Sequence, residues 1–338
     1  MIEIGVALLL VLLLLSALLW AGGGKTIHEV RGSGIIESIP DALEREPVAP
    51  QTLVVLSYTI AYGLGTQSRG APSTEIAAIY DRLDQIVETI AASGADVALL
   101  QEVDFASRRT HDIEQLHYIA AALGWGFAAR AITRECRYLP WPPGRPAGRL
   151  RAGMGVISRY PLLQNTRQRL SQPRTQPVLS VLFAPYHTVQ MVDVQCGTRT
   201  VRLFNVYLDV RDVVTRQQQA RELVAFVQQV GTPTSVFMGA FNVAVADPAT
   251  DAPDQTMAII TEGLQGRFRL VADGDVTDPA ASPQSRQAHV LTGSGVRALE
   301  TRVLSLDASV SDHLPLVAHL RWDAPRALPG GALRKGRR

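Results

Sequence analysis

The chain contains almost no lysine and only two cysteines. Lysine occurs only at Lys25 and Lys335, and arginine supplies the rest of the positive charge. The cysteines, Cys136 and Cys196, are too few for a disulfide framework, and no CxxC or Cys/His pair has the spacing of a zinc site. We therefore do not expect zinc. Arginine suits bidentate phosphate contacts better than lysine, but we favour coding bias as the reason for its excess.

A strong net charge is also absent. The 33 basic residues nearly balance the 31 acidic ones, so the field of the whole molecule is weak. Nothing in the composition therefore requires a nucleic acid partner. With 338 residues, 46% of them hydrophobic, the chain can bury one sizeable core or two ordinary ones.

The first 24 residues lack the basic segment that begins a secretory signal peptide. Only Met1-Ile2-Glu3 precedes the leucine-rich run from Ile4 to Ala21. Its 18 residues would span roughly 27 Å as a helix, close to the hydrocarbon thickness of a bilayer. We interpret residues 1–24 as a single-pass transmembrane anchor, with a cleaved signal as the alternative. Lys25 and Arg31 follow the run, which by a naive count places the large domain in the cytoplasm.

Two flanking segments differ in composition from the rest. Residues 25–50 contain Pro40, Pro47 and Pro50 among alternating charges and are predicted to form a linker. Residues 323–338 are rich in proline, glycine and arginine and are predicted to be a disordered basic tail.

Strand and helix patterns alternate through residues 51–322, which we expect to form one domain. Helices are expected over about 76–90, 113–123 and 216–230, and strands over 52–59, 97–100, 155–158, 188–195, 200–208, 235–239, 290–291 and 316–320. Ser73 and Thr74 would cap the first helix, and Asp112 and Gln115 the second. Many strands with helices between them indicate two packed sheets covered by helices, an α/β or α+β sandwich.

Polar side chains gather at the ends of the apolar strands, where sites commonly form. They are Gln101, Glu102, Asn205, Asp209, Asn242, Asp312 and His313. A carboxylate, an amide and a histidine that converge there could hold Mg²⁺ and a phosphate, because magnesium prefers hard oxygen ligands. Each residue alone is weak evidence, whereas the set in this order is more specific.

This set resembles the motifs of the endonuclease/exonuclease/phosphatase superfamily. Gln101-Glu102-Val103-Asp104 looks like its QEVD motif, and Ser311-Asp312-His313-Leu314-Pro315 looks like its SDHLP motif. Ile157-Ser158-Arg159-Tyr160-Pro161 is similar to its LSRYP strand. The resemblance runs from about Leu53 to Leu320 and implies a four-layer α/β/β/α sandwich with the site between the sheet edges.

The resemblance also implies a reaction, the in-line attack of water on a phosphoester beside a bound Mg²⁺ or Mn²⁺. Glu102 would hold the metal. His313, next to Asp312, would contact the scissile phosphate and stabilise its developing charge. Asn242 would orient the phosphate or the nucleophile.

Two of the matching motifs are altered at groups that act on water or phosphate. Asn205-Val206-Tyr207-Leu208-Asp209 stands where the family has NxHL, so Tyr207 replaces a histidine that contacts phosphate. We keep Asn205 and Tyr207 as catalytic candidates. Gly239-Ala240-Phe241-Asn242 stands where the family has GDFN, so Ala240 replaces the aspartate that activates or orients water.

Two further motifs have lost a supporting group. Leu56-Ser57-Tyr58-Thr59 stands where the family has LSYN, so Thr59 replaces an asparagine that supports the metal. Arg286-Gln287-Ala288-His289 stands where it has R-x-D-[HY], so Ala288 replaces the aspartate that orients the catalytic histidine. Losing a general base lowers the rate about 10²–10⁴-fold, and losing an orienting carboxylate has lowered it about 10⁴-fold in a serine protease.

We therefore favour a membrane-anchored, catalytically impaired member of the superfamily, a pseudoenzyme that binds a phosphate-bearing ligand. An active hydrolase of a phospholipid or another phosphoester is the alternative, with a base supplied by Asp193, Asp209, Asp247 or His187. A scaffold without a ligand is the third hypothesis. Mg²⁺ or Mn²⁺ is expected if the protein is active. Nucleic acid is the least favoured substrate, given the balanced charge and the anchor.

An arginine-rich segment also contains aromatic residues and four prolines. It includes Arg130, Arg134, Arg137, Tyr138, Trp141, Arg145, Arg149 and Arg151. Such a segment could bind a polyanion or a lipid headgroup, and an ordinary charged surface loop is the alternative.

Overall fold

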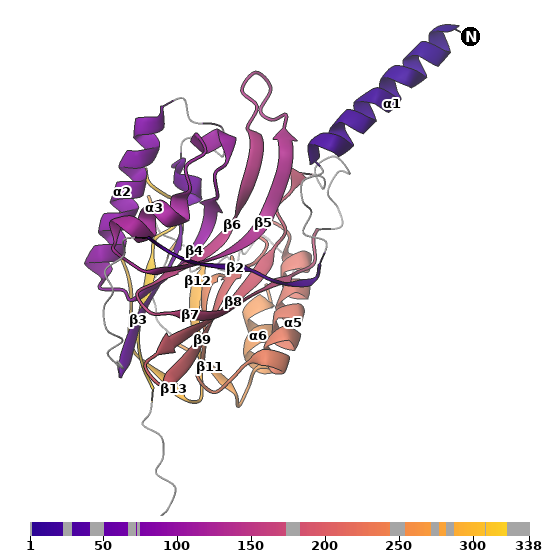
Figure 1. Ribbon diagram of the computed structural model, residues 1–338. Helices are drawn as coiled ribbons and strands as arrows, with labels where there is room; N and C mark the ends of the chain where they lie inside the picture. Colours follow the sequence, from indigo (N-terminus) through magenta and orange to yellow (C-terminus); the bar gives the residue numbers. More distant parts are fainter. Residues whose placement is uncertain are drawn as a thin grey trace, which may run out of the picture.

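The structure is a computed structural model. It describes residues 2–22, 29–40, 51–66, 72, 75–173, 183–243, 254–271, 277–281, 287–307 and 309–322. Within these residues two seven-stranded sheets pack face to face, and helices cover the outer face of each (Figure 1).

The first sheet is antiparallel except where β9 and β10 pair in parallel. In spatial order it contains β1 (Arg31–Ser33), β7 (Leu162–Arg169), β8 (Thr188–Cys196), β9 (Arg199–Tyr207), β10 (Ser235–Ala240), β12 (Ala288–Gly293) and β11 (Phe268–Leu270).

The second sheet is likewise antiparallel except for the parallel pair β3 and β4. In spatial order it contains β13 (Val296–Val303), β14 (Leu316–Trp322), β3 (Thr52–Thr59), β4 (Val97–Asp104), β6 (Gly148–Ser158), β5 (Phe127–Leu139) and β2 (Ile35–Ser38).

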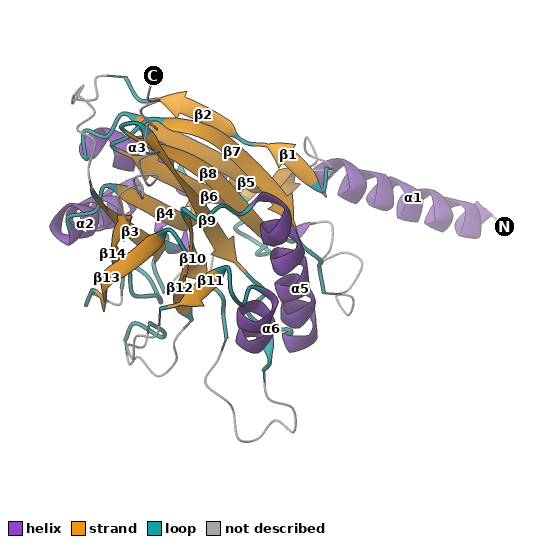
Figure 2. Cartoon of the chain, turned by 90° about the horizontal axis from the view of Figure 1, so that it is seen from below, coloured by secondary structure: helices purple, strands orange, loops and turns teal. Residues whose placement is uncertain are grey.

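Helices form the two outer layers, as Figure 2 shows from below. On the second sheet lie α2 (Ile76–Ser93) and α3 (Gln115–Ala122), with the short helices η1 (Ala61–Gly63) and η2 (Arg108–Thr110). On the first sheet lie α5 (Val213–Val230) and α6 (Thr256–Gly263). Between the sheets is a third apolar layer that includes Val97, Leu203 and Val236. The predicted four-layer α/β/β/α sandwich is confirmed.

Helix α2 shows how the sequence produces one of these layers. Ile79, Leu83, Ile86 and Ile90 recur at helical spacing and are fully buried against the second sheet. Gly94 ends the helix in the left-handed conformation, at φ 71°, which glycine adopts without steric strain. The predicted caps Ser73 and Thr74 lie outside the described residues.

The N-terminal helix α1 (Ile2–Gly22) projects away from the sandwich (Figure 1). Its 19 residues Ile4–Gly22 are long and apolar enough to cross a membrane, and a signal sequence near an N-terminus would pass the same test. The predicted apolar helix is therefore present, and its role as an anchor stays a prediction.

Two sequence expectations need correction, and a third lies outside the described residues. Residues 25–50 are not simply a linker, because the described part of them forms β1 and β2, which pair with both sheets. These strands are only three and four residues long, too short for a readable alternation. The capping box was wrong, since α3 begins at Gln115 without a side-chain cap and Asp112 pairs with Arg149 instead. The tail, residues 323–338, lies outside the described residues.

Candidate functional site

The ends of the two parallel strand pairs meet at one edge of the sandwich. Strands β3 and β4 bring Thr59 and Glu102 to this edge from the second sheet. Strands β9 and β10 bring Tyr207 and Ala240 from the first. A hydrogen bond between the sheets, from the Tyr207 hydroxyl to Oε1 of Glu102 (2.7 Å), shows that the two sets of strand ends face each other.

Glu102 sits on a β-bulge. Leu100 pairs with Gly155 and Val103 with Gly153, so Gln101 and Glu102 together oppose one residue of β6. Glu102 has φ 55°, a conformation that a residue with a Cβ rarely adopts and that often occurs at functional sites. The bulge turns its carboxylate toward Tyr207.

The carboxylate of Glu102 shares its surroundings with His313. Burial raises the pKa of Glu102, while the hydrogen bond from Tyr207 and the nearby charge of His313 oppose that rise. Asp312 is also close enough to influence it. The structure therefore brings together four of the predicted site residues, Glu102, Tyr207, Asp312 and His313.

His313 is held by the loop that carries it. The Ser311 hydroxyl donates to the carbonyl of Thr59 (2.6 Å) and accepts from the backbone amide of His313 (3.1 Å). This serine thus ties the loop to the end of β3. Asp312 Oδ1 lies 3.8 Å from His313 Nε2, and the Asp312 side chain is 58% exposed.

A second carboxylate near His313 comes from a residue that the sequence analysis missed. Asp278 Oδ1 lies 3.6 Å from His313 Nδ1, on the other side of the ring from Asp312. Gln287 Nε2 donates to Oδ2 of Asp278 (2.7 Å), and Leu314 N donates to the carbonyl of Thr277 (2.8 Å). No motif marks Asp278, because only the folding of its segment against the histidine loop gives it a role.

Three of the four positions where the family pattern is altered line one small pocket with His313. Thr59, Ala240 and Ala288 contribute to its wall, and Ala240 pairs directly with Ala288 across β10 and β12. The rest of the described lining is Ser57, Gln101, Gly239, Thr277 and Leu314. This lining offers hydroxyl, amide and imidazole groups and no carboxylate.

Asn205 belongs to a row of buried amide side chains. Its side chain is fully buried between the sheets, where Gln101 Nε2 donates to its Oδ1 (2.6 Å) and its Nδ2 donates to the carbonyl of Leu100 (3.1 Å). Gln190 and Asn165 continue this row of amides toward β5. We call it the amide row. Asn205 lies inside β9, two residues before Tyr207, and its catalytic role stays a prediction.

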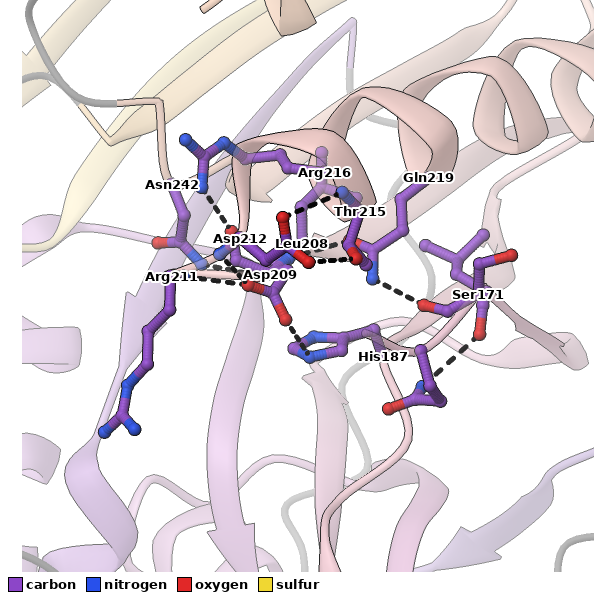
Figure 3. Close-up of polar contacts among 12 residues, drawn as sticks. Ser171, His187, Leu208, Asp209, Arg211, Asp212, Thr215, Arg216, Gln219 and Asn242 are labelled. Atoms are coloured by element: carbon purple, nitrogen blue, oxygen red, sulfur yellow. Dashed lines mark hydrogen bonds and ion pairs between the residues drawn. The ribbon is translucent and has the colours of Figure 1, made fainter. Parts of the chain in front are cut away.

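Asn242 lies just beyond β10, in the region that Figure 3 shows. Its Nδ2 donates to the carbonyl of Leu208 (2.7 Å), and its Oδ1 is buried without a hydrogen-bond partner. The residue is 2% exposed and has φ 54°. It braces the ends of β9 and β10, and its predicted contact with phosphate stays a prediction.

The alternative bases form ion pairs. His187 Nε2 lies 2.9 Å from Asp209 Oδ2, and Figure 3 shows the pair beside the start of α5. The His187 ring stacks on Tyr207, with 6.3 Å between ring centroids. Asp193 instead pairs with Arg202 at 2.7 Å. Asp247 lies outside the described residues.

The arginine-rich segment forms the hairpin of β5 and β6 rather than an irregular loop. Arg130, Arg149 and Arg151 each have an acidic partner. Arg134 differs, because its Nε is buried without a partner, and among the described residues no hydrogen bond or ion pair engages its guanidinium. Burial lowers the pKa of Arg134. An unpaired cation in such a place is unfavourable unless a ligand compensates it.

Tyr62 lies near enough to Glu102, Arg109 and Arg134 for their charges to influence its pKa. Burial raises the pKa of Tyr62, the charge of Glu102 adds to this rise, and the charges of Arg109 and Arg134 oppose it. Arg109 already has an acidic partner, since it forms a buried bidentate ion pair with Asp104 (2.8 Å for both bonds). Arg134, unlike Arg109, therefore has no acidic partner in the described part of the chain and remains open to an anion.

The residues present do not fit a resident metal ion. In the described part of the chain, no three His, Cys, Asp or Glu side chains are grouped as a metal site requires. One oxygen of Glu102 accepts from Tyr207, and the hydroxyl of Thr59 donates to Gln101 Oε1 (3.1 Å). For the predicted Mg²⁺ or Mn²⁺, the candidate acidic ligand is Glu102, and one of its carboxylate oxygens already accepts from Tyr207. We therefore assign no chemical step to the metal.

Comparison with known proteins identifies the family. A sequence model of the Endonuclease/Exonuclease/phosphatase family matches residues 73–313. The chain therefore belongs to this family. A comparison with curated protein sequences found no match.

Solved structures with the same fold include three from different organisms. An endonuclease/exonuclease/phosphatase from Beutenbergia cavernae is 20% identical with a TM-score of 0.60, over 81% of this chain and 72% of that one. A mannosyl-6-phosphatase from Bacteroides thetaiotaomicron is 15% identical with a TM-score of 0.54, over 80% and 100%. The human Nocturnin catalytic domain with bound sulfate is 14% identical with a TM-score of 0.53, over 86% and 97%. At these identities the likeness establishes the fold alone.

Proposed function

We propose that this protein is a membrane-anchored member of the family that binds a phosphate-bearing ligand and hydrolyses it poorly. The observation that carries the proposal is the pocket beside His313, where Ala240 and Ala288 face each other and no carboxylate is present among the described lining. A water molecule there would lack the acid that prepares it for attack. That loss corresponds to about 10²–10⁴-fold in rate.

Two basic side chains, Arg134 and His313, support binding of an anionic ligand. Arg134 has no acidic partner among the described residues, and His313 lines the small pocket with Thr59, Ala240 and Ala288. A guanidinium and an imidazole are suitable donors for phosphate oxygens. The solved Nocturnin domain contains a bound sulfate, which is consistent with oxyanion binding by this fold.

The test measures turnover and binding separately, with the full chain in nanodiscs. With Mg²⁺ or Mn²⁺ and a chromogenic phosphodiester, we expect wild-type turnover no higher than that of His313→Ala. Calorimetry with inorganic phosphate should show binding that His313→Ala weakens. Turnover well above the variant would overturn the impairment, and absence of phosphate binding would favour a scaffold without a ligand.

An active hydrolase is a second candidate because of Asp278. Its carboxylate lies beside His313 and could take the part of the missing aspartate at Ala288. Under this alternative, wild-type protein hydrolyses a phosphoester, and both Glu102→Ala and Asp278→Asn abolish the turnover. If neither variant changes a measured rate, the activity comes from a contaminant and the candidate is rejected.

A further inference from the structure

Strands β5 and β6 continue beyond their neighbours as a two-stranded arm. Strand β4 pairs with β6 only as far as Ala152, and β2 pairs with β5 only as far as Arg130. The ladder between β5 and β6 continues to Leu139 and Gly148. The arm, residues 135–151, rises beyond the rest of the second sheet in Figure 1.

The arm has a fixed shape of its own. Cys136, Ala147 and Leu150 are buried together in a small apolar cluster within it. At the tip, the backbone amide of Ala147 donates to the carbonyl of Trp141 (3.0 Å). An ordered surface loses less conformational entropy on binding than a loose loop does.

The exposed part of the arm is cationic and aromatic. Residues 136–150 contain three arginines and no acidic residue. Trp141 is 65% exposed and Tyr138 is 41% exposed. Of the three arginines, Arg149 pairs with Asp112, whereas Arg137 and Arg145 have no acidic partner in the described part of the chain. Tryptophan, tyrosine and arginine are the residues that bind well at the headgroup layer of a bilayer.

The arm also touches the end of the apolar helix. The Arg137 guanidinium lies 5.7 Å from the centre of the Trp20 ring, and Arg137 Nη1 donates to the carbonyl of Trp20 (3.5 Å). Trp20 is at the domain end of α1 and is 61% exposed. If α1 spans the bilayer, this position corresponds to the membrane interface.

We propose that arm residues 137–147 dock on anionic phospholipid headgroups of the membrane that α1 spans. This inference rests on the anchor in the proposed function. Arg134 precedes Arg137 by three residues on β5, roughly 10 Å at 3.3 Å per residue. Docking therefore holds the cleft near the headgroup layer of the same leaflet, and a phosphate-bearing lipid headgroup is the ligand class that reaches it.

The test compares the full chain in nanodiscs of phosphatidylcholine with nanodiscs that also contain phosphatidylglycerol. Hydrogen exchange is followed in the peptide that spans residues 137–147. We expect slower exchange in the anionic discs and recovery in high salt. Arg145→Glu should reduce the slowing at least about fivefold, since the lost arginine alone contributes about 1 kcal/mol near an anionic surface and the new carboxylate is repelled. Trp141→Ala should also reduce it.

Matched controls lie at the opposite edge of the same sheet. Arg297 and Leu299 are exposed on β13, and Leu299 is 49% exposed. Arg297→Glu and Leu299→Ala should leave exchange in the arm unchanged. The proposal would be overturned if residues 137–147 exchanged equally fast in both kinds of disc, so that any slowing did not depend on lipid charge.

Flotation with lipid vesicles distinguishes membrane binding by the arm from membrane insertion of α1. Full-length protein that floats with phosphatidylcholine vesicles demonstrates the anchor without involving lipid charge. Protein that floats only with phosphatidylglycerol vesicles, and no longer does so after Arg145→Glu, would contradict the anchor while supporting the arm. Protein that floats with neither would overturn both.

Discussion

The Oδ1 atom of Asp278 lies 3.6 Å from Nδ1 of His313, although strands β12 and β13 separate the two residues in the sequence. The distance is within ion-pair range and longer than a hydrogen bond. Such contacts often shorten when a ligand binds. The resemblance implies an aspartate for this purpose at the position of Ala288, and we infer that Asp278 takes its place from a neighbouring segment. The groups that would orient His313 are therefore more complete than those that would prepare water for attack, where Ala240 stands in place of an acid.

Restoring an acid on the water side should restore turnover. Ala240→Asp places a carboxylate in the pocket beside His313 and should raise phosphodiester hydrolysis about 10²–10⁴-fold over wild type. The rate is measured on full-length protein with Mg²⁺ or Mn²⁺. Ala288→Asp is the matched control from the paired strand, and we expect little gain from it because Asp278 already serves the histidine. Equal gains would contradict this division of roles.

Asp278 should act through His313 and not through general stability. In the Ala240→Asp background, Asp278→Asn should lower kcat about tenfold or more while KM changes little, because an orienting carboxylate acts on the transition state. Asp278→Glu should recover part of the rate. The exposed loop residue Asp307 provides the control Asp307→Asn, which should leave both constants unchanged. A parallel loss of rate and unfolding temperature in Asp278→Asn would indicate a structural role only.

Arg134 should contribute to ligand affinity without contributing to stability. Arg134→Gln should weaken binding of inorganic phosphate about 10–100-fold, the range expected for one hydrogen bond to a charged group. Its free energy of unfolding should stay the same or rise, because a half-buried charge without a partner is removed. Calorimetry and denaturant unfolding measure the two effects. Arg149→Gln, on the same hairpin but paired with Asp112, should leave phosphate binding unchanged.

Acid should destabilise the fold through Asp209. Burial raises the pKa of this carboxyl, but the hydrogen bonds from His187 and from two backbone amides outweigh it and hold the pKa at about 2, below the ordinary 3.8. A depressed folded-state pKa stabilises the protein above about pH 4, and this stabilisation is lost as the pH falls toward 2. One pKa unit corresponds to about 1.4 kcal/mol, so we expect a loss of about 2 kcal/mol.

Denaturant unfolding of wild type and Asp209→Asn at about pH 6 and about pH 2 checks this expectation. The stabilisation from Asp209 is fully present at the higher pH and largely lost at the lower pH. The difference in unfolding free energy between the two proteins should shrink by about 2 kcal/mol at the lower pH. Glu300→Gln, an exposed acid on β13, should show no such change. A constant difference would show that the pKa of Asp209 is not depressed in the folded protein.

The sequence predicted the architecture where long periodic patterns exist. The buried stripe of α2 was predicted, and the motifs that contain Glu102 and His313 lie next to β4 and β14 as expected, while their roles stay predictions. It failed where position depends on contacts between distant segments. The expected strand over 200–208 nearly matches β9, but its pattern does not show that Asn205 turns inward between the sheets. Asp278 has no pattern around it, and its proximity to His313 exists only after folding.

The amide row has a mechanical consequence for the cleft. Asn165, Gln190 and Asn205 all project from the first sheet and donate to carbonyls of the second. Sliding one sheet by a single residue would break these bonds together, so the two halves move as one rigid body. A substitution that shortens an amide side chain in the row is then expected to weaken ligand binding without altering any group that contacts the ligand.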